Sequence, residues 1–539
     1  MKKINLLDCT LRDGAYIVNG EFGTTTIGGV IQKLQNANVD IIECGWLKDP
    51  EHKVGTTYYH VPSDLEQYKL VPKRKFTTYV AMIDYNRYDV NNLPMCDTSV
   101  IDAIRIVFPC DKVDEGLSLV TPIREKGYKV YLQAANTLGY SDTDLIELAL
   151  KVNKLKPEGL SIVDTFGAMY KKDLFRILEV LNNYLDKDIK LGFHSHNNQQ
   201  LSYALSMEFV DFLYETDREI IVDGSLTGMG RGAGNTPLEL IANYLNKAYS
   251  TDYDMNMIMD AIDMYITPFM DNFKWGYQIP YLISGIYECH VNNVAYLTKT
   301  HRTASKDIKI IFDALDKETR RHYDYDNLEN VYAEYQNKVV DDLPSKEILK
   351  NALSNKTILA VLPGSSAKEK LIETQKIIDT EKPVVVGINS IIPDYNYDYL
   401  FFTNEVKYEY AKETYKEKFE NSKKIITSNI KTLGDNDEII INYNDILKRG
   451  WKYYDNSMIM FLRLMRDILP EKIDIVGFDG YRSDKNYSEG TLKASLDVGE
   501  MNILHNEIID MLKDYKKTIN DKIKFYSISD SDFTRILNN

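Results

Sequence analysis

Two histidines on one short segment are the residues whose type and spacing first suggest chemistry. His194 and His196 lie in Gly192-Phe193-His194-Ser195-His196, which alternates as a β-strand does. Side chains two residues apart on a strand point to the same face. Both imidazoles can therefore present a neutral nitrogen to one divalent cation. The pair alone is a weak signal, because two histidines hydrogen-bonded near a strand end give the same pattern.

A carboxylate and a guanidinium stand far upstream, in Leu7-Asp8-Cys9-Thr10-Leu11-Arg12-Asp13-Gly14. An ion held by Asp13 and the two histidines keeps positions open for a chelating 2-oxo acid such as pyruvate. It would act as a Lewis acid toward an enolate, and Arg12 would stabilise the developing negative charge. Glu43 is predicted to orient Arg12 through a bidentate pair. The alternative for Arg12 and Glu43 is a structural salt bridge.

The elements that must position these residues alternate as parallel βα units from residue 4 to about 225. Eight such units predict a (β/α)8 barrel, with the active site at the carboxyl ends of the strands. Asn136 and Thr165 fall at such ends as well, and we expect both of them, with Tyr281 on a later helix, to bind substrate. A doubly wound sheet, the alternative, brings the ends of the first and seventh strands together less naturally. The predicted strands are Ile4–Cys9, Val39–Gly45, Phe76–Ile83, Ala103–Phe108, Lys129–Ala134, Leu160–Asp164, Ile189–His194 and Glu219–Asp223.

A second α/β region follows a helical stretch. Its seven strand-like runs predict an open, Rossmann-like sheet. We therefore expect a barrel at 1–250, a helical extension and linker at 251–350, and a Rossmann-like domain at 356–539. The predicted strands are Thr357–Leu362, Val384–Ile388, Tyr399–Phe402, Lys424–Thr427, Glu438–Ile441, Ile473–Phe478 and Lys524–Ser527.

Composition narrows the class of protein. The chain has 539 residues and a net charge of −15, which argues against a nucleic-acid partner. Its five cysteines show no Cys-x-x-Cys spacing, so reduced thiols in the cytoplasm are expected. We see neither a signal peptide nor an apolar run long enough to cross a bilayer, and expect no membrane partner. The sequence leaves both a monomer and a homodimer as alternatives.

Four motifs in order carry a family resemblance. They are Asp8-x-Thr10-Leu11-Arg12-Asp13-Gly14, Ile42-Glu43-x-Gly45, His194-x-His196-Asn197 and Gly230-x-Gly232-x-Gly234-Asn235. The first half of the chain resembles the DRE-TIM metallolyases, nearest to the 4-hydroxy-2-oxovalerate aldolases. The resemblance implies Asp13, His194 and His196 as metal ligands, with Asn235 as a further ligand. It also implies Mn²⁺ or Mg²⁺, with Zn²⁺ or Co²⁺ as alternatives, and a 2-oxo acid and an aldehyde as substrates.

The sequence departs from this family after Arg-Asp-Gly. The hydroxy-oxovalerate aldolases carry a histidine there as general base, whereas this chain has Tyr16 in roughly that place. Tyr16 would serve as a base only if its pKa were depressed. Tyr281 and His290 on the later helices are other candidates, with helix packing as the alternative. Thr165 lies in a segment similar to one that lines the family's substrate pocket.

The second α/β region is less legible. Gly364 and Ser365 stand between a strand and a helix, where free N–H groups favour a phosphate. Asn389 and Asp479 follow neighbouring strands and are candidates for contacts with a base, a ribose or a diphosphate. The region faintly resembles Rossmann-like bacterial sialyltransferases and pterin-pyrophosphokinase-type domains, which implies a nucleotide or nucleotide-sugar. A purely structural domain is the alternative.

These observations favour a divalent-metal-dependent aldolase or lyase. One alternative is an acyl-CoA Claisen-type synthase on the same barrel, although the sequence shows no separate acyl-CoA signature. The other is a non-catalytic protein that binds a nucleotide or sugar. It is motivated by the missing histidine base and opposed by intact Arg12, Asp13, His194 and His196.

Overall fold

The computed structural model describes residues 3–300, 303–336, 339–431, 438–481, 491, 498–519 and 523–538. The chain divides into two units. The barrel unit comprises Met1–Ala295 and Leu315–Tyr323, and the sheet unit comprises Tyr296–Ala314 and Asp324–Asn539. The helical stretch expected at 251–350 is thus shared between the two units.

Eight parallel strands close the barrel, as the sequence predicted. Their order is β1-β9-β8-β7-β6-β5-β4-β2, and β1 also pairs with β2. A ninth, two-residue strand, β3, adds to the outer side of β2. The strands are β1 (Ile4–Asp8), β2 (Ile41–Leu47), β3 (Tyr58–Tyr59), β4 (Thr78–Asp84), β5 (Ala103–Phe108), β6 (Lys129–Ala134), β7 (Gly159–Asp164), β8 (Lys190–Ser195) and β9 (Ile220–Gly224).

Burial on both faces explains the apolar strands. β2, β7 and β9 are buried at every position, as expected where helices cover the outer face and side chains fill the interior. Inside the barrel, Leu7, Ile41, Val80, Tyr131 and Ile221 pack together. This layer of apolar side chains fills the barrel interior below the polar ends of the strands.

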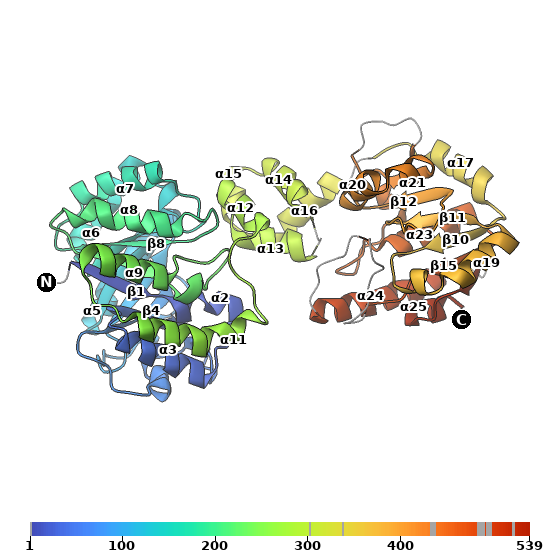
Figure 1. Ribbon diagram of the computed structural model, residues 1–539. Coiled ribbons are helices and arrows are strands. Elements are labelled where there is room, and N and C mark those ends of the chain that lie inside the picture. The colour runs from blue at the N-terminus through green and yellow to red at the C-terminus, as the bar shows by residue number, and fades with distance from the viewer. Residues whose placement is uncertain are drawn as a thin grey trace. The chain divides into compact units, whose positions relative to one another are not determined.

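Amphipathic helices surround the strands (Figure 1). On α7, for example, Leu174, Ile177, Leu178 and Leu181 are buried at helical spacing. The helices from the barrel onward are α1 (Thr10–Asp13), α2 (Ala15–Val18), α3 (Thr24–Asn36), α4 (Val113–Ser118), α5 (Val120–Glu125), α6 (Asp142–Leu155), α7 (Lys171–Tyr184), α8 (Ser202–Tyr214), α9 (Leu238–Tyr249), α10 (Met255–Ala261), α11 (Thr267–Met270), α12 (Ile279–Ile286), α13 (Val291–Thr300), α14 (Ser305–Asp313), α15 (Lys317–Arg321), α16 (Tyr325–Gln336) and α17 (Leu343–Leu353).

The sheet unit holds seven parallel strands in the order β14-β13-β12-β11-β10-β15-β16. The order reverses between β10 and β15, as in doubly wound folds. The strands are β10 (Thr357–Val361), β11 (Val384–Ile388), β12 (Tyr399–Phe402), β13 (Lys423–Thr427), β14 (Glu438–Ile441), β15 (Lys472–Val476) and β16 (Lys524–Ser527). The predicted second α/β domain is therefore present.

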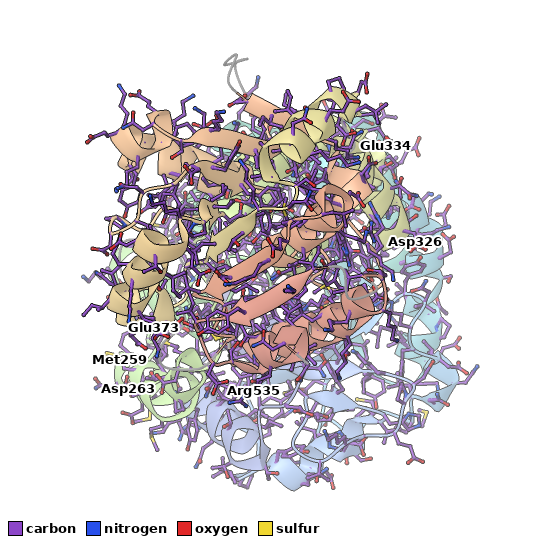
Figure 2. The ribbon with its side chains drawn as sticks, turned by 90° about the vertical axis from the view of Figure 1, so that its right-hand side faces the viewer. Met259, Asp263, Asp326, Glu334, Glu373 and Arg535 are labelled. Atoms are coloured by element: carbon purple, nitrogen blue, oxygen red, sulfur yellow. The ribbon has the colours of Figure 1, made fainter. Side chains whose placement is uncertain are left out.

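Helices cover both faces of this sheet. One face packs on α17, α23 and α24, and the other on α19, α20 and α21. Their outer surfaces are charged, as Figure 2 shows for Glu373 on α19 and Arg535 on α25. The helices are α18 (Ser366–Glu369), α19 (Leu371–Glu381), α20 (Glu405–Thr414), α21 (Lys416–Glu420), α22 (Tyr443–Ile446), α23 (Ser457–Ile468), α24 (Val498–Lys516) and α25 (Asp532–Asn538). Among the described helices, we find none with the length and apolarity needed to span a bilayer.

Candidate metal centre

Three ligand-type side chains converge at the carboxyl ends of β1 and β8. Asp13 lies on α1, directly after β1, while His194 and His196 lie at and just beyond the end of β8. One ligand atom from each lies within 4.8 Å of the others, and all three residues are buried. The structure therefore brings together the three residues that the motifs pointed to.

Hydrogen bonds fix which nitrogen each histidine presents. His194 Nδ1 lies 3.0 Å from Asp223 Oδ2, and His196 Nδ1 lies 3.0 Å from the carbonyl oxygen of Asp164. Because both partners are acceptors, each Nδ1 carries a proton, so Nε2 is the nitrogen of each ring that can bind an ion. A carboxylate or carbonyl behind a histidine is the arrangement that orients imidazoles toward a metal.

The donor set fits a divalent cation. His194 Nε2, His196 Nε2 and Asn235 Oδ1 are buried and have no hydrogen-bond partner among the described residues. Buried polar atoms are nearly always satisfied, so three orphaned acceptors beside a carboxylate indicate a ligand that the protein does not itself supply. Two imidazoles with oxygen donors suit first-row divalent ions and do not select one of them.

Asn235 reaches this cluster through the glycine-rich loop after β9. Its Nδ2 donates to Asp13 Oδ2, which leaves Oδ1 directed elsewhere. His196 forms an isolated β-bridge with Asn235, which ties the loop to the end of β8. A side chain at Gly230 would place its Cβ 2.6 Å from Asp13 Oδ2. Glycine is thus required where the loop crosses the carboxylate.

A buried chain of ion pairs lies beneath the ligands. Arg12 donates from Nε to Glu43 (2.6 Å) and from Nη1 to Asp13 (2.7 Å). The predicted bidentate Arg12–Glu43 pair is therefore wrong, because the guanidinium divides its donors between two carboxylates. Glu43 Oε1 lies 3.0 Å from Arg105 Nη1. Arg105 also donates to Asp223 (2.6 Å), the residue behind His194.

Sequence reasoning missed Arg105 and Asp223 as parts of the centre. A signal was present for Arg105, because a charged residue interrupts the apolar strand Ala103–Phe108. Its position places it on the inward face, since it pairs with Met82 on β4 and lies between the buried Ile104 and Ile106. Asp223 lies one residue before the end of the last barrel strand and is buried like the apolar residues Ile221 and Val222 before it.

The network sets the charge of the ligands. Burial alone would raise the pKa of Asp13, but Arg12, His196 and His194 outweigh it and hold that pKa well below its usual range. Burial likewise opposes ionisation of Asp223, yet Arg105 and His194 keep its pKa low. Burial lowers the pKa of His194. The centre thus combines ionised carboxylates with a neutral imidazole, the protonation states that metal binding needs.

A cavity of about 270 Å³ opens over these residues. Besides the ligands its lining includes Arg12, Tyr16, Thr165, Arg231 and His290. Asn136 and Tyr281, both predicted to bind substrate, are not among the lining residues. The backbone N–H of Asn136 donates to Thr165 Oγ1 (2.6 Å), so Asn136 helps to hold the Thr165 loop.

Tyr16 lines the cavity beside the ligands. Loss of hydration raises its pKa above the ordinary value, although Arg231 opposes the shift. From the protein's own groups alone, the Tyr16 pKa is raised rather than depressed, and its role as a base stays a prediction. The ring instead stacks beneath the guanidinium of Arg231 at 4.6 Å and meets Trp46 edge-on at 6.0 Å. The Tyr16 side chain forms part of the cavity wall, and its hydroxyl can donate a hydrogen bond there.

The predicted phosphate turn of the sheet unit lines a cavity of about 70 Å³ together with Asn389 and Asp479, and several of its polar groups bond within the protein. Ser366 donates its backbone N–H to Asp479 Oδ2 (2.7 Å), and its hydroxyl also donates to Asp479. The Gly364 N–H donates to the carbonyl of Gly477 (3.0 Å). Asn389 exchanges hydrogen bonds with Thr403. The N–H groups of Gly364 and Ser366 are therefore paired within the protein, and α18 behind them has only four residues. The nucleotide site stays a prediction. Ser365, the fourth residue predicted here, is the N-cap of α18 without a side-chain capping bond.

The fold and the centre define a (β/α)8 barrel protein with a candidate Asp-His-His metal centre at the carboxyl ends of its strands. The HMGL-like family model matches residues 110–264. That confirms the resemblance drawn from the motifs for the first half of the chain. The faint resemblance of the second half stays a prediction.

Curated relatives match the same half. The 4-hydroxy-2-oxovalerate aldolase of Shewanella woodyi is 28% identical over 275 residues, which cover 50% of this chain and 79% of that protein. The enzyme of the same name from Shewanella halifaxensis is 27% identical over 281 residues, covering 50% and 78%. The crystal structure of Bacillus subtilis HMG-CoA lyase overlays with a TM-score of 0.40 and 16% identity, covering 48% of this chain and 91% of that one.

Proposed function

We propose that the barrel unit is a divalent-metal-dependent aldolase that forms or cleaves a carbon–carbon bond through the enolate of a 2-oxo acid. One observation carries the proposal. The unpartnered Nε2 atoms of His194 and His196 converge with Asp13, and Asp13 is hydrogen-bonded to the guanidinium of Arg12. The similarity to curated 4-hydroxy-2-oxovalerate aldolases supports the reaction class.

Asp13, His194 and His196, with Asn235, would hold the ion, which when bound supplies a Lewis acid for a chelating 2-oxo acid. Arg12 is fixed by Glu43 and Asp13 in one orientation. A guanidinium held this way needs no reorganisation as negative charge develops on the enolate oxygen, so it stabilises that charge at little cost. Asp223 keeps the His194 tautomer that leaves Nε2 free.

The cavity volume supports small reactants. About 270 Å³ is near the lower end of ligand sites, which run upward from roughly 300 Å³. A three-carbon acid and a short aldehyde suit such a space. An acyl-CoA would place only its acyl end there, so the Claisen-type alternative is less well supported.

Methyl-proton exchange tests the proposal without an aldehyde. The purified full chain is analysed for bound metal, then incubated with pyruvate in deuterated water with Mg²⁺ or Mn²⁺, and deuterium in the methyl group is followed by mass spectrometry. We expect bound divalent metal and exchange that a chelator stops. Exchange that is absent from metal-loaded protein, or that the chelator leaves intact, would overturn the proposal.

A further inference from the structure

His290 is held at the cavity by contacts from the helices that follow the barrel. It immediately precedes α13, and its backbone N–H donates to the carbonyl of Arg320 (2.9 Å). The ring packs on Tyr323 with centroids 4.7 Å apart. His290 and Tyr323 both line the cavity that contains Asp13 and His196. A segment remote in sequence thus adds an imidazole to the candidate active site.

One hydrogen bond determines what this imidazole offers. The backbone N–H of Asn292 donates to His290 Nδ1 (3.2 Å), so Nδ1 carries no proton. Loss of hydration, aided by the charges of Arg231, His322 and His196, lowers the pKa of His290 to about 2. The ring is therefore neutral and must carry its proton on Nε2. It presents a hydrogen-bond donor to the cavity rather than a base.

Arg231 gives the same cavity an unbalanced positive charge. The charge of Arg12 is met by Glu43 and Asp13, and Arg87 lies 3.5 Å from Asp84. Arg231 stacks on Tyr16 and forms an ion pair with no carboxylate in the part of the chain that the structure describes. A guanidinium stacked on an aromatic ring keeps its donor edges available for a planar anion.

From these features we propose that His290 and Arg231 form the subsite for the aldehyde, and that this aldehyde carries an anionic group. His290 Nε2–H donates a hydrogen bond to the aldehyde oxygen, and the Arg231 guanidinium pairs with a carboxylate or phosphate on the same molecule. The proposal rests on the proposed function and names the substrate class of that site. His290 becomes a catalytic residue that the motif segments do not contain.

The reaction balances without any further reagent. In condensation the pyruvate methyl group loses a proton to solvent, and the enolate carbon forms a bond to the aldehyde carbon. The carbonyl electron pair moves to oxygen, where the His290 N–H stabilises it until a proton arrives from water. Cleavage runs through the same steps in reverse. His290 keeps its proton throughout, as a neutral electrophilic imidazole does.

Substitutions of His290 distinguish a donor from a base. His290→Phe removes the donor, whereas His290→Gln restores a neutral N–H near the Nε2 position. His505→Asn is the matched control, since His505 lies in the sheet unit and pairs with Asp532. Condensation of pyruvate with 4-oxobutanoate and methyl exchange are measured side by side. We expect the ratio of condensation to exchange to fall about 100-fold in His290→Phe, the scale for losing one such donor, and to recover largely in His290→Gln.

Arg231 is tested with two aldehydes that differ only in their terminal group, 4-oxobutanoate and butanal. Wild type is expected to favour 4-oxobutanoate by at least tenfold in kcat/KM, and Arg231→Gln to abolish that preference mainly through KM. Arg176→Gln, which removes an exterior arginine paired with Asp142, should change neither. Phosphorylated glyceraldehyde separates phosphate from carboxylate as the preferred anion.

The outcomes separate this inference from the proposed function. Absence of methyl exchange in metal-loaded wild type contradicts the function itself. Exchange in wild type together with equal use of the two aldehydes, or an unchanged preference in Arg231→Gln, overturns the anionic subsite alone. Equal loss of the condensation-to-exchange ratio in His290→Phe and His290→Gln shows that His290 is not a donor, and so does an unchanged ratio in His290→Phe.

Discussion

The barrel unit and the sheet unit both place polar side chains at the carboxyl ends of parallel strands, but they use them differently. In the sheet unit, Asp479 bonds to Ser366 and Asn389 bonds to Thr403. In the barrel unit, His194 Nε2, His196 Nε2 and Asn235 Oδ1 remain buried without a hydrogen bond among the described residues, and His196 Nε2 lies 3.5 Å from Asp13 Oδ2. In the sheet unit these strand-end polar groups are therefore hydrogen-bonded to each other, whereas in the barrel unit several of them have no hydrogen bond within the described part of the protein.

The difference shows what identifies a site. Position at a strand end reflects topology, which both units share. Unsatisfied buried acceptors are costly, about 1–3 kcal/mol each when nothing fills them, so a protein retains them where a ligand provides the missing partner. By this criterion the barrel centre is the better candidate for chemistry.

The largest effect is expected from removing one of the proposed metal ligands of the barrel unit. His194→Ala or His196→Ala should abolish bound divalent metal and reduce methyl exchange by at least about 1000-fold, because no neighbouring group replaces the lost nitrogen. Far-ultraviolet circular dichroism should remain that of wild type. Unchanged metal content in both single variants would show that the ion binds elsewhere.

Arg12→Lys should act on turnover rather than on the ion. An ammonium cannot reproduce the fork that engages Glu43 and Asp13 together. We expect exchange to fall by roughly 100- to 1000-fold, the cost of removing an oxyanion donor. Metal content, measured in parallel, should be retained. Near-normal turnover would refute the proposed role of Arg12.

A smaller effect is expected from changing Asp223, which is hydrogen-bonded to the proposed ligand His194. Asp223→Asn weakens the hold on His194 Nδ1 and removes the charge that balances Arg105. Metal affinity, measured by competition with a chelator, should fall by about 10- to 100-fold. Asp142→Asn on the barrel exterior provides the control. Wild-type affinity in Asp223→Asn would mean that the tautomer is fixed without this carboxylate.

The smallest effect on chemistry is expected in the sheet unit. Asp479→Ala leaves the Ser366 N–H unpaired, so the free energy of unfolding of this unit should fall by about 1–3 kcal/mol, while methyl exchange stays unchanged. It also opens the turn to an anion. Thermal shift with inorganic phosphate and a nucleotide panel should therefore respond more in Asp479→Ala than in wild type. An equal or stronger response in wild type would show that the carboxylate does not compete for the turn.

Sequence alone predicted the eight barrel strands and the Asp-His-His cluster, because both depend on local patterns. The apolar runs define the strands, and parallel topology then forces Asp13 and His194 to the same rim. Bounds shifted only slightly; the second strand begins at Ile41 rather than Val39. All seven strands of the sheet unit were likewise visible as apolar runs.

The remaining features depend on packing between distant segments. Asp479 meets Ser366 across 113 residues, so nothing in the turn itself shows that its N–H groups are taken. His290 reaches the cavity only because the segment before α13 is held by Arg320. Tyr16 remains 43% exposed, and its contact with Arg231 joins segments that one sequence cannot bring together. The backbone of Asn136 holds the Thr165 loop, a contact that the sequence did not indicate, and its role in binding substrate stays a prediction.

The closure of the barrel also sets the moment at which its centre can exist during synthesis. Asp13 and Asn235 meet across 222 residues, and β1 completes its pairing only with β9. A nascent chain still on the ribosome therefore lacks the full ligand set until β9 and the glycine-rich loop that follows it have emerged. Contacts of such long sequence separation form slowly. Capture of the ion would thus report a finished barrel, and an incomplete chain would not sequester metal in this site.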